Sequence, residues 1–534
     1  MGIDNFIVHT KTNYNMKNKL LGNKGIRDCR RTILNNCKAI VLLVFLSVSM
    51  ISSGQSNKDI PIEFQDYVIN KSTKVEYKKV YPQTVEEMLN YKFAPCPDSI
   101  SKEQAFEDIE QFEYLLETAF SGREYWEKQG CDFNKIYSKL NDFVDNKETI
   151  CVLDLENYMS SLLKGKTAIS HFSIRGHKYH GFEGHKSIYF TDILLNKNKK
   201  GKFIVIDSKV DSVPVGSELD DNEINEHVFP TLSPKGKEHY LVGIWSYDKV
   251  TNKALSFNGK YVNIPFHPTR LKQAKFNKSP LFKVDTIDNI PVIRLATFMP
   301  PKDNLPLLES FEEYGKKLRN EEKFILNICN NDGGSAIHAM NFIRNLNTVI
   351  FNESMSAYMY SPSLSQMYAQ VVINDYPQIF KQPGVEEYTK QVIKHQQLLD
   401  KFKMTPQKEW DFAITNTSDD GEGTYDGKMI ILMNRKTESA AEYAVHYSKS
   451  VKNIVLVGEN TYGAGVFTPG MKYYLPNSKI CMQIPHEINI IPGFRESVGF
   501  VPDYWLDTNK PVEEIIKWLN NPETYQFRFS DNDN

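Results

Sequence analysis

The stretch GKMIILMNRKTESAAEYAVHYSK, residues 427–449, decides the fold because it joins two kinds of hydrophobic pattern at one turn. Residues 429–433 are all apolar, which is typical of a short strand buried on both faces. Residues 440–447 repeat apolar side chains at three- and four-residue spacing, which predicts a helix. A buried strand followed directly by a helix indicates an α/β sheet whose faces are covered.

The same alternation of strand and helix patterns recurs on both sides of this stretch. The further runs that predict strands or helices lie at 290–299, 307–319, 323–329, 336–346, 453–459 and 479–485. We therefore expect an α/β core built from two parts of the chain, residues 281–346 and 422–510. The intervening residues 347–421 are rich in Tyr, Gln and Lys, and we predict that they form a helical insertion over the core.

The segments outside this core show other patterns. Residues 55–175 contain three stretches with apolar side chains at helical spacing, which predict a helical N-terminal cap. Residues 180–280 carry short β-like runs separated by charged, Gly or Pro turns, which predict a small β-rich module. Residues 511–534 are expected to form a C-terminal tail.

A leader at residues 1–54 contains the most apolar stretch of the chain, residues 39–51. Basic residues precede this stretch and small residues follow it, with a cleavage site predicted after Gly54. We therefore expect a signal peptide and export to the periplasm, the cell envelope or the medium. The stretch is short for a membrane span of about 20 residues, and an uncleaved anchor formed by residues 39–51 is the alternative.

The overall composition excludes several classes of function. The chain has 534 residues, with 64 basic against 66 acidic side chains, so no basic surface for nucleic acid is predicted. The cysteines show no spacing typical of zinc ligands, and we predict neither a metal site nor a cofactor. Cys131 and Cys151 could pair in an oxidising compartment. The composition leaves the oligomeric state open.

Ser439 stands at the turn between the strand and the helix, where two interpretations are open. Serine is an ordinary N-cap residue, which binds free N–H groups at the start of a helix. A serine here is also exposed at the positive end of the helix dipole, which favours attack on a carbonyl and stabilises an oxyanion. The local sequence alone favours the capping interpretation.

Five sequence blocks in order resemble the catalytic domain of the C-terminal processing peptidases and tricorn core proteases, a family of serine peptidases. The blocks are VIRLATF, LNICNNDGGS, GKMIILMNRKTESAAE, VGENTYGAG and RESVGFVPD, between residues 292 and 503. The resemblance implies a crotonase-like α/β core and a hydrolase that acts on protein or peptide substrates without a cofactor. It also implies that Ser439 is the nucleophile of a serine-type endopeptidase.

The resemblance further implies an oxyanion hole made of backbone N–H groups. The N–H of Ala440 would supply one donor, and the family takes another from a GG turn, here Gly333 and Gly334. Preorganised donors of this kind carry much of the rate enhancement in acyl transfer. Before the other blocks are considered, the two glycines are equally consistent with an ordinary turn between a strand and a helix.

A serine nucleophile needs a base, because its hydroxyl does not ionise near neutral pH. The processing peptidases use a lysine in the TYGxG block, but this chain has Ala464 there, which excludes that dyad. The tricorn-like branch uses a histidine preceded by a serine, together with a late glutamate. The matching residues here are His171, Ser170 and Glu496, so His171 would be the general base and the other two would orient it.

Departures from the family pattern keep a second function open. The core strand ends in NICNNDGG rather than D-x-R-x-N-x-G-G, so Asn327 and Cys329 replace an acid and an arginine. A catalytically inactive relative that binds peptides or hydrophobic ligands is therefore the alternative. The β-rich module occupies the place of the family's peptide-binding PDZ domain, and VPVGSELDDNEIN, residues 213–225, faintly resembles the end of such a domain.

Overall fold

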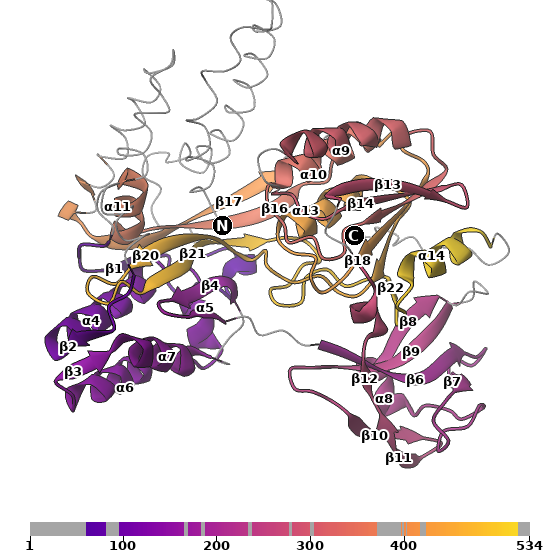
Figure 1. Ribbon diagram of the computed structural model, residues 1–534, viewed down its shortest axis with the longest axis horizontal. Helices are drawn as coiled ribbons and strands as arrows, with labels where there is room; N and C mark the ends of the chain where they lie inside the picture. Colours follow the sequence, from indigo (N-terminus) through magenta and orange to yellow (C-terminus); the bar gives the residue numbers. More distant parts are fainter. Residues whose placement is uncertain are drawn as a thin grey trace, which may run out of the picture.

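The computed structural model shows a group of helices, an α/β core and a β-rich module, with a long sheet between the helices and the core (Figure 1). The described residues are 60–81, 95–164, 169–182, 187–232, 238–276, 280–299, 304–370, 397, 400–401, 403–416 and 423–521. The predicted signal peptide or anchor, residues 1–54, lies outside these residues.

The α/β core is a six-stranded sheet in the order β13-β14-β15-β18-β19-β22, parallel from β14 onward. Its strands are β13 (Phe282–Ile287), β14 (Ile290–Leu295), β15 (Lys323–Asn327), β18 (Lys428–Met433), β19 (Ile454–Gly458) and β22 (Tyr504–Trp505). Its helices are α9 (Leu305–Leu318), α10 (Ala336–Asn347), α13 (Ala440–Tyr447) and α14 (Pro511–Leu519). The described residues of this core therefore mix strands and helices as an α/β fold does.

Alternate side chains of β18 enter two different hydrophobic clusters. Met429 and Ile431 pack in the cluster that includes α9, α10 and α13, whereas Ile430 and Leu432 pack in the cluster that includes α14. The strand is thus buried on both faces, which confirms the expectation from its apolar run. Helix α14 lies within the segment that we expected to be only a tail, because Trp518 and its neighbours on the helix are buried in this cluster.

A second sheet, of seven strands, connects the core with the helices near the N-terminus (Figure 1). The strand order is β1-β17-β16-β21-β4-β5, and β20 also pairs with β21. The strands are β1 (Ser72–Lys74), β4 (Ile169–Arg175), β5 (Tyr179–Phe182), β16 (Glu353–Tyr360), β17 (Gln407–Asn416), β20 (Phe467–Tyr474) and β21 (Cys481–Ile490). Strand β4 thus places the end of the predicted cap, residues 55–175, in this sheet.

The prediction that residues 347–421 form a helical insertion is wrong for much of the described part. Strands β16 and β17 form an antiparallel hairpin there, and α11 (Pro362–Gln370) is a helix between them. Strand β16 also pairs with β21, where Met355 lies opposite Ile490. This pairing with a segment distant in the sequence overrides the local helical tendency, since strand formation depends strongly on neighbouring strands.

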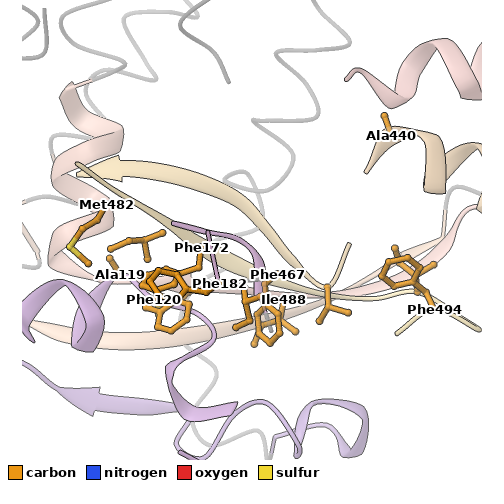
Figure 2. Packing of buried hydrophobic residues seen from close by; sticks show 14 of the residues in the cluster. Ala119, Phe120, Phe172, Phe182, Ala440, Phe467, Met482, Ile488 and Phe494 are labelled. Carbon is orange, nitrogen blue, oxygen red and sulfur yellow. The ribbon is translucent and has the colours of Figure 1, made fainter. Parts of the chain in front are cut away.

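The helices near the N-terminus anchor one end of the seven-stranded sheet. They are α4 (Lys102–Thr118), α5 (Arg123–Lys128), α6 (Phe133–Asp145) and α7 (Val152–Leu163), joined by the short pair β2 (Ser99–Ser101) and β3 (Thr149–Cys151). Phe172 of β4 stacks on Phe120 with ring centroids 4.7 Å apart and meets Trp126 edge to face at 5.4 Å. Figure 2 shows Phe120, Phe172 and Phe182 gathered in one group, which fixes the strand that carries His171.

The β-rich module consists of a five-stranded sheet and a hairpin. Its elements are β6 (Ser187–Lys197), β7 (Phe203–Ser208), α8 (Asp221–His227), β8 (Val228–Leu232), β9 (Glu238–Ser246), β10 (Asn252–Phe257), β11 (Lys260–Pro265) and β12 (His267–Pro268). Strands β6 and β9 pair along most of their length, and the module has its own hydrophobic cluster.

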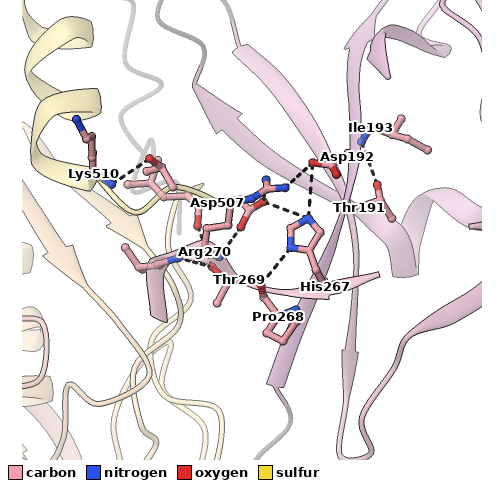
Figure 3. Close-up of polar contacts among 12 residues, drawn as sticks. Thr191, Asp192, Ile193, His267, Pro268, Thr269, Arg270, Asp507 and Lys510 are labelled. Carbon is pink, nitrogen blue, oxygen red and sulfur yellow. Dashed lines mark hydrogen bonds and ion pairs between the residues drawn. The ribbon is translucent and has the colours of Figure 1, made fainter. Parts of the chain in front are cut away.

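An ion-pair network attaches this module to the core (Figure 3). Arg270 Nη1 donates to Asp507 Oδ2 at 2.7 Å, and Arg270 Nη2 donates to Asp192 Oδ1 at 2.5 Å. The Asp507 side chain is 4% exposed, and burial raises its pKa while the Arg270 charge opposes this shift. Beside the network, Trp505 of β22 meets Phe229 of the module edge to face at 5.2 Å. Arg270 therefore compensates a buried carboxylate at the boundary of the two parts.

Two features are absent from the described residues, a membrane-spanning helix and a metal site. No described helix is long and apolar enough to cross a membrane. Within the same residues, no group of three or more His, Cys, Asp or Glu side chains could hold a metal ion. Cys131 is buried and Cys151 is exposed, and no disulfide joins these two described side chains.

We expect Arg270→Ala to lower the free energy of unfolding by about 1–3 kcal/mol, because Asp507 would stay buried without its cation. The Arg270 side chain is 37% exposed, so the loss should be smaller than for a fully buried pair. Urea unfolding followed by circular dichroism measures the change. The control is Lys316→Ala, which breaks an exposed pair with Glu313 and should cost less than about 1 kcal/mol. Equal losses in the two variants would contradict the role given to Arg270.

Candidate active site

Ser439 lies where the chain turns from β18 into α13. Its backbone has φ 53° and ψ −114°, a combination that L-residues rarely adopt. The Ser439 N–H donates to Glu442 Oε2 at 3.0 Å, so a glutamate side chain caps the start of the helix. A strained turn between a strand and a helix is typical of sites that must present a side chain to a ligand.

The turn after β15 packs directly against Ser439, and glycines make this contact possible. Gly333 has φ 80°, and a Cβ there would lie 2.9 Å from Ser439 Cβ and 3.1 Å from Ala440 N. Gly334 has φ 133°, and a Cβ there would lie 2.3 Å from the carbonyl carbon of Phe298. Both positions therefore require glycine, because any side chain would strain the backbone and push neighbouring segments apart.

Two backbone N–H groups of these turns have no acceptor among the described residues: that of Ala440, which follows Ser439, and that of Gly334, which follows Gly333. Ala440 is the first residue of α13, where N–H groups have no partner within the helix. The Gly333 N–H is not available in the same way, because it donates to Asn331 Oδ1 at 3.0 Å. The turns thus offer two unpaired donors next to the serine, at the positive end of a helix dipole.

A network of amide side chains holds these two turns together. Asn331 is fully buried, its side-chain Nδ2 donates to Leu295 O at 3.1 Å, and its backbone carbonyl accepts from the Glu438 N–H at 2.9 Å. Asn434 Nδ2 donates to Asn330 Oδ1 at 2.9 Å. The bonds to Glu438 and Asn434 join the turn after β15 to the turn after β18, and the bond to Leu295 joins it to the end of β14, so the two turns fix each other's position.

The two residues that depart from the family pattern also brace this region. Asn327 Oδ1 accepts from the Cys329 N–H at 3.0 Å, a bond that a carboxylate could accept equally well. Cys329 is 2% exposed, and burial raises the pKa of its thiol well above the ordinary value. Neither substitution leaves the turn without support, because the amide replaces the acid as acceptor and the thiol packs in the core.

His171 lies on β4, half-buried beside Phe467 at the start of β20. Burial lowers its pKa to about 4, and a hydrogen bond with the Phe467 backbone opposes the shift. Its Nδ1 atom is buried and has no hydrogen-bond partner among the described residues. The imidazole is therefore neutral at pH 7, which is the form that a general base must have.

Glu496 lies in a turn after β21, and its side chain reaches the segment at the start of β20, which also contacts His171. Its Oε2 accepts from the Val466 N–H at 2.9 Å, one residue before Phe467. Burial raises the pKa of the Tyr125 phenol and the Glu496 charge adds to this effect, while the Tyr125 ring lies 5.5 Å from that of Phe467. The predicted histidine and glutamate therefore approach two consecutive residues of the chain.

The structure brings the predicted residues together in two groups. The first group is Ser439, Ala440, Gly333 and Gly334, and the second is His171 and Glu496. The groups are linked because the Ala464 N–H donates to the same Glu442 Oε2 that Ser439 uses. Phe467 follows Ala464 by three residues, so the two residues are at most about 10 Å apart along the chain. No hydrogen bond joins His171 to Ser439 among the described residues, and the Ser170 side chain lies outside them.

A comparison with protein families identifies the region that contains the first group. Residues 289–504 match the sequence model of Peptidase family S41. This part of the chain is similar to the domain of that peptidase family. This match confirms the family resemblance that the five sequence blocks imply, and it includes Ser439, both glycines and Glu496, whereas His171 precedes it. No curated protein matches the chain.

Solved structures that align with this chain have low sequence identity to it. Mature CPAF aligns at 14% identity over 79% of this chain and 95% of its own, with a TM-score of 0.39. The photosystem II D1 C-terminal processing protease aligns at 13% identity over 76% and 93%, with a TM-score of 0.34. The tricorn protease aligns at 13% identity over 77% and 35%, with a TM-score of 0.32. At these scores the alignments assign no role to any residue.

Sequence reasoning missed two residues that hold the site, Asn331 and Glu442. Asn331 orients the Gly333 peptide and joins the two turns. Glu442 stands three residues after Ser439, and the pattern S-x-x-E is the sequence signature of a capping box. That pattern could have predicted the bond to the Ser439 N–H, but the other donors to Glu442 come from a segment that only the fold brings near.

We expect Gly333→Ala to destabilise the domain by about 1–3 kcal/mol more than Gly130→Ala, because overpacking adds to backbone strain. The two glycines have similar φ values, 80° and 85°, but a Cβ at Gly130 would meet nothing within 4 Å. Gly130→Ala therefore measures the strain alone. Thermal unfolding of both variants gives the difference, and equal midpoints would contradict the close packing of Gly333 on the Ser439 turn.

Proposed function

We propose that this S41 chain is an exported serine-type endopeptidase that hydrolyses protein or peptide substrates through an acyl-enzyme on Ser439. The observation that carries the proposal is the contact between the Gly333 turn and the strained Ser439 turn. This contact lies inside the region that matches the peptidase family. It provides a serine, a helix start and unpaired N–H donors in one place, which acyl transfer requires.

In the proposed reaction, Ser439 Oγ attacks the carbonyl carbon of the substrate while its proton passes to His171. The C–N bond then breaks, and the proton on His171 passes to the leaving amine, which leaves an ester on Ser439. A water molecule attacks this ester with His171 again as the base, and the acid product and free Ser439 are released. The reaction consumes only water and returns Ser439 and His171 to their starting protonation states, so the proposed mechanism needs no cofactor.

The proposed oxyanion hole uses the N–H groups of Ala440 and Gly334, since both lack an acceptor among the described residues. The Gly333 N–H is not part of the proposed oxyanion hole, because it donates to Asn331. Gly333 contributes instead by lacking a side chain, which lets its turn pack against Ser439. Donors fixed by the surrounding fold stabilise the developing negative charge without reorganising, which is where much of the rate enhancement arises.

We assign His171 as the base because its imidazole is neutral and its Nδ1 is unpaired among the described residues. Glu496 and Ser170 are proposed to orient it, as in the tricorn-like branch. The arrangement replaces the Ser–Lys dyad, for which this chain has Ala464. In enzymes without substrate the bond between base and nucleophile is often long and tightens when substrate binds, so the proposal requires this approach in the complex.

An inactive relative that binds peptides or hydrophobic ligands is the alternative function. This alternative rests on Asn327 and Cys329, which replace an acid and an arginine of the family pattern. Asn327 nevertheless makes the hydrogen bond that braces the turn. We therefore favour catalysis. The crotonase-like core, the PDZ-like character of the β-rich module, and export directed by residues 1–54 belong to the same proposal, with a membrane anchor at 39–51 as the alternative to cleavage.

Labelling by a fluorophosphonate, which reacts with activated serines, tests the proposal. We expect the wild-type protein to be labelled and to cleave a peptide library. In Ser439→Ala and His171→Ala, the rate of labelling and the rate of cleavage should each fall by at least about 1000-fold. Ser161→Ala and His180→Ala are the matched controls, because Ser161 is exposed on α7 and the His180 imidazole pairs with Glu156 of the same helix. A folded wild-type protein that is neither labelled nor active would instead support the binding function.

The rate of labelling should depend on pH, and the pKa of His171 should set this dependence. Because its pKa is lowered to about 4, the base stays neutral at ordinary pH, and the rate should fall only as pH drops through about 4. A fall centred near the ordinary value of 6.5 would contradict the assignment.

A second buried histidine needs a control in this experiment. His446 on α13 is fully buried, and burial also lowers its pKa to about 4. The variant His446→Leu removes this group, and the acid fall in labelling should remain. Circular dichroism at each pH separates loss of the base from loss of the fold.

A further inference from the structure

Glu442 is a buried carboxylate directly beneath the Ser439 turn. It is 2% exposed, and no cation within the described residues lies at ion-pair distance from it, although the Arg435 charge acts on it from farther away. Burial raises its pKa, whereas hydrogen bonds from Thr461, Ala464, Gly463 and Ser439 oppose this shift. A buried carboxylate without a cation is costly, so the protein must satisfy it with hydrogen bonds.

Each oxygen of this carboxylate accepts two hydrogen bonds. Oε1 accepts from Thr461 Oγ1 at 2.6 Å and from the Gly463 N–H at 2.7 Å. Oε2 accepts from the N–H groups of Ser439 and Ala464, both at 3.0 Å. An ionised carboxylate only accepts hydrogen bonds, and all four of these groups donate, so the carboxylate matches its surroundings completely.

The same bonds join the serine to the segment that carries Glu496. Thr461 Oγ1 also accepts from the Phe500 N–H at 2.8 Å, and the Ser497 N–H donates to Gly463 O at 2.8 Å. Gly499 closes over this contact, since a Cβ there would lie 2.8 Å from Glu442 Oε1. Three segments that are separate in sequence therefore meet at one side chain.

We infer that Glu442 is a positioning residue for the reaction proposed above. It holds residues 461–464, and through them Glu496 and the strand beside His171, at a fixed distance from Ser439. Glu442 contacts both sides of the proposed site. It accepts from the backbone N–H of Ser439 and from that of Ala464. Two residues after Ala464, the Val466 N–H donates to Glu496. The inference rests on the proposed function.

The variant Glu442→Gln tests this role with little change of shape. A glutamine offers one acceptor and one NH2 group, and the NH2 must face two former donors. If it faces Ser439 and Ala464, two N–H groups lose their acceptor. If it faces the other pair, the Thr461 hydroxyl can turn but the Gly463 N–H is still unpaired. We expect kcat to fall by about 100-fold while KM changes by less than about threefold, because the reacting groups move and the substrate contacts stay.

A matched control separates positioning from stability. Asp108 in α4 is equally buried and accepts from the N–H groups of Asn477 and Ser478, both at 2.8 Å, but no contact links it to Ser439. We expect Asp108→Asn to lower the unfolding temperature and to leave kcat per folded molecule unchanged. Should Glu442→Gln fail to fold, Thr461→Val removes a single hydroxyl from the same cluster, and it should lower kcat with KM unchanged.

Ser439→Ala in the same series distinguishes the two ways of failing. If the wild type is active, Ser439→Ala is inactive, and the folded Glu442→Gln and Thr461→Val variants keep the wild-type kcat, the inference is wrong while the proposed function stands. An inactive but folded wild type overturns the proposed function and the inference together. Loss of kcat in both the Glu442 and the Asp108 variants, in proportion to stability, would show that Glu442 only supports the fold.

Discussion

The parallel pairing of β15 with β18 is the contact on which the candidate site depends. Asn327 lies opposite Leu432 in this pair, so both strands end at the same edge of the sheet. The turns that follow therefore leave the sheet side by side, as at the carboxyl edge of other α/β sheets. One turn carries the glycines and the other carries Ser439, and a change of register would separate them.

The positive φ of Ser439 is stabilised by what surrounds it. A residue held in so rare a conformation costs about 1–3 kcal/mol and persists only where neighbouring structure determines it. Here the Glu442 side chain accepts from the serine N–H, and the backbone carbonyl of Asn331 accepts from the preceding Glu438 N–H. Glu442 and Asn331 are both buried, so these hydrogen bonds are not exchanged with water and the strained turn stays in place.

The sequence predicts those structural features that depend on local patterns better than those that depend on contacts between distant segments. Strand β18 and the start of α13 follow from a local pattern, and the order of the five blocks indicates the family. The hairpin of β16 and β17 was missed, because its strands are stabilised by pairing with each other and with β21, which lies far along the chain. Glu442 was missed for the same reason, since three of its four donors come from residues 461–464.

The two groups of candidate residues are positioned by different sheets. The serine and its N–H donors depend on the six-stranded sheet, whereas His171 depends on β4 and on the aromatic packing of Phe172. The described contacts between the groups run through residues 461–467 and Glu442. Under the proposed mechanism, a small shift of the seven-stranded sheet would therefore change the distance from the proposed base to the proposed nucleophile without disturbing the proposed oxyanion donors. If the mechanism holds, substitutions near β4 should affect proton transfer, whereas substitutions in the Ser439 turn should affect charge stabilisation.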